Sequence, residues 1–208
     1  MDSWSTLDSR WQQAMGPALR AYLSGSAPAG AAVFAADGTL VSQGSNAFQR
    51  ERLAHAEIQA LNAVPQAAAR SDLTLYCTME PCPMCTGAIR MMQLRTVRFA
   101  TRDPAAGSTD MLAMTPFMRH FPCAVTGPED TLLESANVAL MLEYRTRNGH
   151  RRWRDEWYSY LPSAVEVGER LAADKQFLTW QREQSSPELV YNVVCELVQQ
   201  TSRNRHEQ

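Results

Sequence analysis

Residues 78–89 read TMEPCPMCTGAI and place two cysteines, Cys82 and Cys85, among prolines. Residues i and i+3 of a helix lie on the same face, so a helix over 82–92 directs both sulfurs toward one point. Pro81 suits the first position of such a helix, where a missing N–H costs nothing. The pair fits a disulfide framework, a structural zinc clamp or an active site, and the rest of the chain has to decide among these.

Composition favours a globular protein of a reducing compartment. The chain has 208 residues, of which 45% are hydrophobic and 20% charged, as in ordinary soluble domains. No apolar run approaches the roughly 18 residues of a membrane span, and the start MDSWSTLDSRW does not resemble a signal peptide. We therefore expect a cytoplasmic protein without membrane association. The cysteines number five, and an odd count in a reducing compartment favours metal binding or catalysis over disulfides.

Hydrophobic patterning predicts alternating helices and strands. An amphipathic helix over 4–23 precedes a hairpin centred on Asp37-Gly38. The elements predicted after the hairpin are a helix over 55–64, a strand over 73–77, a helix over 82–92, a strand over 96–101, a weak strand over 122–126 and a helix over 128–147. This alternation favours an α/β layered fold over an all-helical one.

The composition shifts near residue 148. Asn148-Gly149 ends the last helix of the core, and the sequence HRRWRDEWYSY that follows is dense in arginine and aromatic residues. Helices are predicted beyond it, over 163–183 and 187–201. We interpret residues 1–149 as a core domain and residues 150–208 as a helical C-terminal extension. The extension has three candidate roles, which are to cover a pocket, to build a dimer or to change substrate choice.

The arginines between 145 and 154, together with Trp153, have two interpretations. They fit a surface that binds phosphates and stacks a base, and they also fit the solvated end of a helix. The formal net charge of −2 favours the second interpretation, because a protein that binds RNA is expected to carry a broader basic field.

A zinc ion held by Cys82 and Cys85 needs further ligands. His55 is followed by a carboxylate two residues later, in His55-Ala56-Glu57, and opens a predicted helix. Three protein ligands leave a fourth position for water, which distinguishes a catalytic zinc from a structural one. Zinc lowers the pKa of bound water from about 15.7 toward roughly 7, and Glu57 is the carboxylate placed to accept its proton. That geometry requires His55 and Glu57 to lie in the first turn of their helix.

A closed structural site is the alternative for the metal. Cys77 lies five residues before Cys82 and would supply a fourth ligand. However, a cysteine in a strand such as TLYCT is more often a small buried apolar residue. A closed site would also leave Glu57 without a task.

The two motifs together resemble a known family. HAE followed by PCPMC matches the H-x-E…P-C-x-x-C signature of zinc deaminases that act on nucleobases. The longer stretch TLYCTMEPCPMCTGAI, followed by FATRDPAAGS, is similar to the branch of the cytidine/deoxycytidylate deaminase-like superfamily that contains tRNA adenosine deaminases and bacterial guanine deaminases. The resemblance covers roughly residues 25–147. It implies a three-layer α/β/α fold around a mixed five-stranded sheet, zinc held by His55, Cys82 and Cys85, and Glu57 as the proton shuttle.

The same resemblance implies three substrate contacts. Asn46 matches an asparagine that binds the edge of the base, the backbone N–H of Ala56 is expected to hold a ring carbonyl, and Asp103 matches a loop aspartate near the substrate. From the residues alone, Asn46 also fits a turn after the hairpin, and Asp103 also fits a loop cap. Glu80 fits a role in orienting the turn before Cys82.

We therefore expect a zinc-dependent hydrolytic deaminase that releases ammonia from a nucleobase, a nucleoside or a related small heterocycle of the guanine, adenine or cytosine type. The resemblance also implies a homodimer, and the acidic balance argues against a nucleic-acid partner. Two alternatives remain. One is a tRNA adenosine-to-inosine deaminase, and the other is a non-catalytic interaction protein stabilised by zinc, in which Glu57 would have no role.

Overall fold

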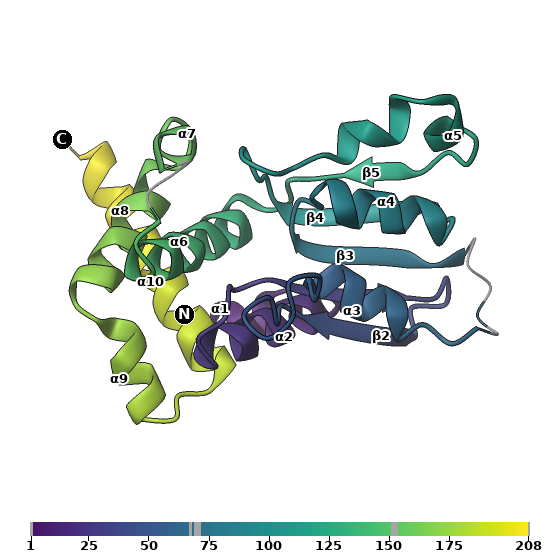
Figure 1. Cartoon of the computed structure of the whole chain (residues 1–208). Helices are drawn as coiled ribbons and strands as arrows, with labels where there is room; N and C mark the ends of the chain where they lie inside the picture. The colour runs from purple at the N-terminus through teal and green to yellow at the C-terminus, as the bar shows by residue number, and fades with distance from the viewer. Residues whose placement is uncertain (1, 67, 69–71, 151–153, 208) are drawn as a thin grey trace.

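The structure is a computed structural model that describes residues 2–66, 68, 72–150 and 154–207 (Figure 1). Arg151, Arg152 and Trp153 of the arginine-rich run lie outside these residues. Within the described part of the chain, no helix combines the length and the apolar character that crossing a membrane requires.

One mixed sheet forms the centre of the molecule. Its strands are β1 (Gly30–Phe34), β2 (Leu40–Ser45), β3 (Thr74–Met79), β4 (Thr96–Thr101) and β5 (Ala124–Thr126), in the order β2-β1-β3-β4-β5. β1 pairs antiparallel with β2 and β3, whereas β3 with β4 and β4 with β5 are parallel. The turn between β1 and β2 contains Gly38 with a φ of 86°, a conformation that glycine adopts without strain. The predicted mixed five-stranded sheet and its hairpin are confirmed.

Helices cover both faces of this sheet. They are α2 (Ser9–Leu23) and α6 (Thr131–Arg147) on one face and α3 (Ala56–Asn62) and α4 (Pro83–Met91) on the other. Alternate residues of a strand point to opposite faces, so Ala32 and Phe34 pack with α2, whereas Ala31 and Val33 pack with α3 and α4. The result is the expected three-layer α/β/α arrangement.

The C-terminal helices pack behind α2 and α6. The remaining elements are α1 (Ser3–Thr6), η2 (Thr109–Ala113), α5 (Pro116–Arg119), α7 (Arg154–Tyr158), α8 (Pro162–Ala173), α9 (Gln176–Arg182) and α10 (Pro187–His206). Figure 1 shows α7 to α10 gathered around α6, with both ends of the chain among them. Val167, Trp180 and Val194 belong to the same buried cluster as residues of α2 and α6. Helices α8, α9 and α10 therefore share a continuous hydrophobic core with the helices on the sheet.

Two predicted helices are interrupted. The helix predicted over 4–23 is split into α1 and α2, because Asp8 accepts a hydrogen bond from the backbone N–H of Arg10 and begins a new helix. The helix predicted over 163–183 is split into α8 and α9 at Lys175, whose φ is 53°. A capping aspartate and a single residue with positive φ both leave the apolar periodicity unchanged, which is why the pattern alone did not locate the breaks.

Helix α3 lies directly on β2 because position 44 is glycine. A Cβ atom on Gly44 would lie 2.0 Å from the carbonyl oxygen of Ala56 and 2.4 Å from the nitrogen of Ala60. The Ser42 hydroxyl donates a hydrogen bond of 2.7 Å to the carbonyl oxygen of Ala60. These contacts set the position of the start of α3 relative to the sheet.

We predict that Gly44→Ala lowers the free energy of unfolding by about 1–3 kcal/mol, because overpacking against the backbone of α3 forces the helix away from β2. Urea unfolding measures this change.

Gly87→Ala in α4 is the matched control. A Cβ on Gly87 has no atom within 4 Å, and alanine is favoured over glycine inside a helix by up to about 1 kcal/mol. The control is expected to be as stable as the wild type or more so. A Gly44→Ala protein that unfolds like this control would contradict the proposed role of the close approach.

Candidate metal centre and active site

His55 and Cys82 each occupy the N-cap position of a helix. The backbone of both residues is extended, with ψ values of 153° and 172°, and neither side chain caps its helix. N-cap side chains usually accept a hydrogen bond from the first turn, so these two are available for another role. Helix α4 begins at Pro83 and not at Pro81 as the sequence had suggested. Cys82 therefore precedes the first turn of α4, and Cys85 lies within it.

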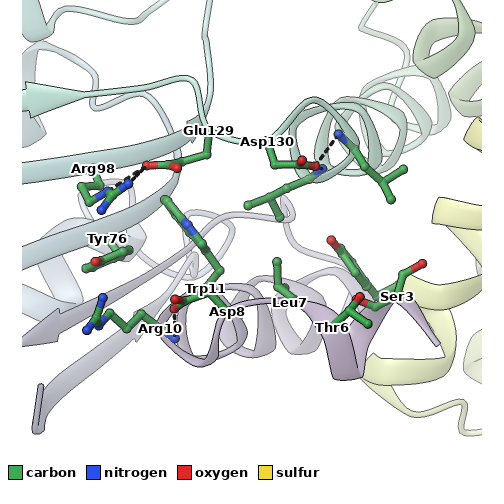
Figure 2. A pocket seen from close by; sticks show the side chains of 13 residues that line it. Ser3, Thr6, Leu7, Asp8, Arg10, Trp11, Tyr76, Arg98, Glu129 and Asp130 are labelled. Carbon is green, nitrogen blue, oxygen red and sulfur yellow. Dashed lines mark hydrogen bonds and ion pairs between the residues drawn. The ribbon is translucent and has the colours of Figure 1, made fainter.

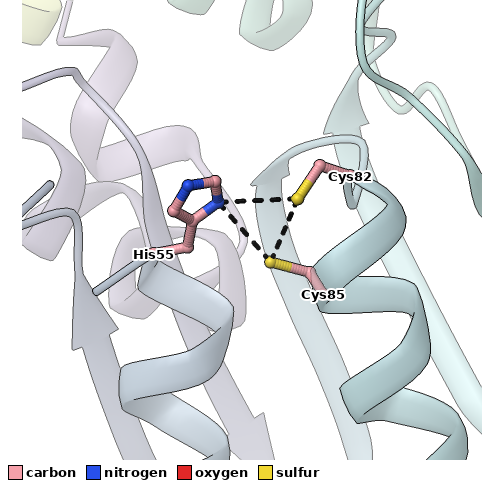
Figure 3. Close-up of side chains that lie close together, drawn as sticks. All are labelled: His55, Cys82 and Cys85. Carbon is pink, nitrogen blue, oxygen red and sulfur yellow. Dashed lines mark hydrogen bonds between the residues drawn. The ribbon is translucent and has the colours of Figure 1, made fainter. Parts of the chain in front are cut away.

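The three candidate ligand atoms form a compact triangle (Figure 3). The Nδ1 atom of His55 lies 3.5 Å from Sγ of Cys82 and 3.7 Å from Sγ of Cys85, and the two sulfurs are 3.6 Å apart. A tetrahedral zinc ion with ordinary bond lengths places two thiolate sulfurs about 3.8 Å apart and a sulfur about 3.6 Å from a histidine nitrogen. The sulfur separation is too long for a disulfide, in which it is about 2.05 Å. The triangle therefore fits three corners of a zinc tetrahedron.

The two sulfurs have opposite pKa shifts. Their mutual hydrogen bond lowers the pKa of Cys82 to about 4, while the same contact and burial raise the pKa of Cys85. The shifts are opposite because the pair shares one proton. Zinc binds thiolates, so zinc binding at this site displaces that proton.

Cys77 is not part of the triangle. It lies on β3, is buried, and packs in the core between the sheet and the helices α3 and α4. Among the described residues, the group of potential ligands whose atoms lie within 4.8 Å of one another consists of His55, Cys82 and Cys85. This arrangement supports a site with three protein ligands over a closed site with four.

Glu57 lies in the first turn of α3, two residues after His55. This is the placement that the proton-transfer hypothesis requires. The residue is only 6% exposed, and burial raises the pKa of its carboxyl group to about 7, although its own backbone N–H and His55 act in the opposite direction. A buried carboxyl group with such a pKa can both accept and donate a proton near neutral pH.

A cavity of about 490 Å³ opens beside the triangle. Its volume is within the range of roughly 300–1,000 Å³ found for small-molecule sites. The lining residues are Ala27, Ala29, Asn46, Phe48, His55, Glu57, Met79, Glu80, Cys82, Asp103, Ala106, Met141, Tyr144, Arg145 and His150. Asn46 and Asp103, two of the residues predicted to bind substrate, thus line the same cavity as His55 and Cys82.

Asn46 is fixed through its carbonyl oxygen. Oδ1 accepts hydrogen bonds from the backbone N–H of Phe48 at 2.9 Å and from the Ser26 hydroxyl at 3.2 Å. Both lone pairs of Oδ1 are therefore occupied. Asn46 combines the turn role with a place in the cavity wall, and its amide nitrogen is the group suited to contact a ligand.

Asp103 is fixed by its own loop. Oδ1 accepts hydrogen bonds from the backbone N–H groups of Ala105 at 2.9 Å and Ala106 at 3.1 Å. Glu80 supports the same loop, because it accepts hydrogen bonds from the Thr109 hydroxyl at 2.7 Å and from the backbone N–H of Asp103 at 3.4 Å. The loop-cap interpretation of Asp103 and the turn-orienting interpretation of Glu80 agree with these contacts.

Ala56 is the first residue of α3 and is buried. Its N–H is one of the N-terminal donors that have no partner within the helix itself. Substrate contact by Asn46, Ala56 and Asp103 stays a prediction.

The sequence favoured a solvated helix end for the arginine run and did not place Arg145 in the cavity wall. Arg147 pairs with Glu143 at 2.9 Å, as expected for a helix end, but Arg145 lines the cavity together with Met141 and Tyr144. The spacing i, i+3 and i+4 puts these three side chains on one helix face, and this was the signal available in the sequence. Phe48 also went unnoticed, and its ring lies edge-on to His55 with centroids 6.1 Å apart.

A family match covers the residues of the triangle. Residues 5–101 match the family described as the cytidine and deoxycytidylate deaminase zinc-binding region. Nearly half of the chain is thus similar to a deaminase zinc-binding region. The match includes Asn46, Glu57 and the three ligands, whereas Asp103 and the C-terminal helices lie beyond it.

Individual relatives of the deaminase region are similar over part of their length. The tRNA(Ile)-lysidine synthase of Deinococcus deserti is 33% identical over 58% of this chain and 24% of the relative. The tRNA-specific adenosine deaminase of Bacillus subtilis is 33% identical over 49% of this chain and 65% of the relative. The chain thus spans less than two thirds of each of these two curated relatives. A solved structure in complex with 2,6-diaminopurine is 26% identical with a TM-score of 0.53, over 72% of this chain and 85% of that one.

A second cavity, of about 420 Å³, lies between α1, α2, the sheet and the start of α6 (Figure 2). Most of its charged side chains have structural partners. The Nε of Arg98 donates to Glu129 at 2.8 Å, Asp8 caps α2, and Asp130 caps α6. No member of the ligand triangle lines this cavity, so the cavity beside His55 is the candidate active site.

We predict that the purified protein carries about one zinc ion per chain and that Cys85→Ala loses it, because two remaining ligands do not hold zinc in a protein site. Metal analysis of the dialysed protein measures the zinc content.

Cys77→Ala is the control for this experiment, since it removes a nearby buried thiol that the triangle does not include. The variant is expected to retain its zinc. Loss of zinc from Cys77→Ala would favour the closed four-ligand site.

Proposed function

We propose that the chain is a zinc-dependent hydrolytic deaminase that releases ammonia from the amino-substituted ring of a nucleobase, a nucleoside or a related small heterocycle. The observation that carries the proposal is the placement of buried Glu57 in the first turn of α3, beside the three-ligand triangle and in the wall of the same cavity. A structural zinc site has no need of a buried carboxyl group at this place. The alternative of a non-catalytic interaction protein leaves Glu57 unexplained.

The chemistry divides between the metal and the chain. Zinc supplies a Lewis acid that lowers the pKa of water toward about 7. Glu57 would accept a proton from the water molecule that attacks the ring carbon and pass it to the ring nitrogen. It would then take the proton of the added hydroxyl group and deliver it to the leaving amine. In the net reaction, the ring C–NH₂ group and water give a C=O group and ammonia. Proton transfer by a positioned carboxyl group contributes about 10²–10⁴ to the rate.

The other cavity residues bind and orient the ring. Asn46 donates through its amide nitrogen, because its carbonyl oxygen is occupied by Phe48 and Ser26. The N–H of Ala56 holds a ring carbonyl, and Asp103 contributes a carboxylate from its capped loop. The edge of Phe48 next to His55 provides an apolar wall for a planar ring.

A small substrate is the first choice. The cavity of about 490 Å³ suits a single small molecule, and a solved relative was crystallised with 2,6-diaminopurine. Deamination of adenosine in tRNA is the second candidate, because the tRNA-specific adenosine deaminase of Bacillus subtilis is 33% identical over 49% of this chain. A panel of amino-purines, amino-pyrimidines, their nucleosides and tRNA, assayed for ammonia or inosine, decides between them. The homodimer implied by the resemblance stays a prediction, which sedimentation measures.

We predict that Glu57→Gln lowers ammonia release by at least about 10²-fold, because the amide has no carboxylate to take up the proton. The variant is expected to keep its zinc, since Glu57 is not among the three ligands. Ammonia release and zinc content are measured on the same preparation.

Glu51→Gln is a suitable control, because Glu51 is an exposed carboxylate in the loop before α3 and does not line the cavity. Its turnover is expected to equal that of the wild type. Unchanged turnover in Glu57→Gln would remove Glu57 from the mechanism.

A further inference from the structure

Arg145 is a cation in the wall of the deaminase cavity. It projects from the last turns of α6 and lines the cavity with its neighbours Met141 and Tyr144. Its Nη1 atom is excluded from solvent. Burial lowers the pKa of the Arg145 guanidinium, and the nearby negative charge of Asp103 opposes this shift. A partly desolvated cation of this kind is stabilised by any further negative charge that enters the cavity.

Asp103 is held by its own loop. One of its two carboxylate oxygens accepts the backbone N–H groups of Ala105 and Ala106 and so is committed to the loop. A guanidinium presents several donors in a planar fork and pairs best with a phosphate or carboxylate group through two parallel hydrogen bonds. The cavity beside the ligand triangle therefore also contains a guanidinium group, that of Arg145, which is suited to bind a phosphate or carboxylate.

Trp157, in α7 of the C-terminal extension, contacts both sides of this arrangement. It is fully buried, and its ring centroid lies 5.1 Å from Cζ of Arg145. Its indole Nε1–H donates a hydrogen bond of 3.1 Å to the carbonyl oxygen of Arg102, the residue before Asp103. One side chain thus fixes the guanidinium by a cation–π contact and the aspartate loop by a hydrogen bond.

The same tryptophan supports the apolar wall. Trp157 belongs to a buried cluster with Met79, Met141 and Leu161, and both methionines line the cavity. The C-terminal extension therefore packs against residues that form the wall of the deaminase cavity.

We propose that Arg145 is a substrate-binding residue that pairs with an anionic oxygen group on the substrate, and that Trp157 is the positioning residue that holds it. This inference rests on the proposed deaminase function and narrows its substrate to an amino-heterocycle carrying a phosphate, as in a nucleoside monophosphate. The net charge of −2 favours a small phosphate ester over an RNA strand, because an RNA-binding protein is expected to carry an extended basic surface.

Binding is measured first, in the zinc-loaded Glu57→Gln protein, where turnover does not interfere. Calorimetry compares adenosine, guanosine, cytidine and deoxycytidine with their 5′-monophosphates, and tRNA is tested alongside. Hydrogen bonds to a charged group contribute about 1.5–3 kcal/mol, or roughly 10–100-fold in affinity. At least one monophosphate is expected to bind at least about tenfold more tightly than its nucleoside. Adding Arg145→Gln is expected to remove this preference while affinity for the nucleoside changes little.

Arg182→Gln is the matched control for charge, because Arg182 is an exposed arginine in the last turn of α9 and does not line the cavity. It is expected to leave the preference for the monophosphate unchanged. Three results would each overturn the inference. The monophosphates bind no more tightly than the nucleosides, or the preference for the monophosphate survives Arg145→Gln, or tRNA binds while none of the monophosphates does.

Trp157→Phe tests the positioning role, because it removes the indole donor and keeps an aromatic face. Loss of one hydrogen bond is worth about 0.5–1.5 kcal/mol, so the preference for the monophosphate is expected to fall by roughly 2–10-fold with zinc content unchanged. Trp180→Phe is the control, since Trp180 is a buried tryptophan of α9 that packs on Tyr22 and not on the cavity. If both variants lose stability but neither changes the preference, Trp157 has a structural role only.

The two levels of the proposal fail separately. With Glu57 intact, ammonia released equally well from nucleosides and monophosphates overturns the role of Arg145 and leaves the deaminase function standing. If monophosphates bind through Arg145 but no compound of the panel releases ammonia, the deaminase function is overturned and the binding role of Arg145 stands.

Discussion

The site depends on bringing the starts of two helices together so that three ligand atoms lie 3.5–3.7 Å apart. His55 and Cys82 achieve this from N-cap positions, where the side chain projects beyond the end of the helix. Their helices lie side by side on one face of the sheet. Gly44 sets the distance between α3 and the sheet, because a side chain at this position would collide with the backbone of Ala56. The geometry of the ligand triangle therefore follows from backbone packing. The ligand atoms can shift by only about a few tenths of an ångström before the bond lengths no longer suit zinc.

Electrostatics in the cavity follow from that packing. The first N–H groups of α3 and α4 have no partners within their helices and carry a partial positive charge, which favours the thiolates and any anion that forms beside the metal. Glu57 is held in the same turn but is buried, so the cost of desolvating its charge raises its pKa to about 7. Two carboxyl groups nearby, Glu80 and Asp103, are instead engaged in loop hydrogen bonds. Position thus separates the buried carboxyl group proposed for proton transfer from two that accept hydrogen bonds in a loop.

The C-terminal helices are part of the architecture of the site as well as of the core. Helices α8 to α10 complete the hydrophobic cluster behind α2 and α6. Helix α7 packs behind the cavity wall, because Trp157 contacts Arg145 and the loop that carries Asp103. The family match ends at residue 101, so this wall is built from a part of the chain that the match does not cover. The cavity wall therefore depends on these helices as well as on the matched region that carries the ligand triangle.

The sequence determined what local spacing can determine. The pairs Cys82 with Cys85 and His55 with Glu57 lie within single helical turns, so their proximity follows from three or four residues, and the alternation of strands and helices predicted the layered sheet. Tertiary structure decided the rest. Arg145 and Asp103 lie in one cavity wall although they are far apart in the chain, and Trp157 packs behind them. Capping residues such as Asp8 divided helices whose apolar pattern is continuous. Periodicity reports which face of an element is buried, but it carries no information about which distant element will cover that face.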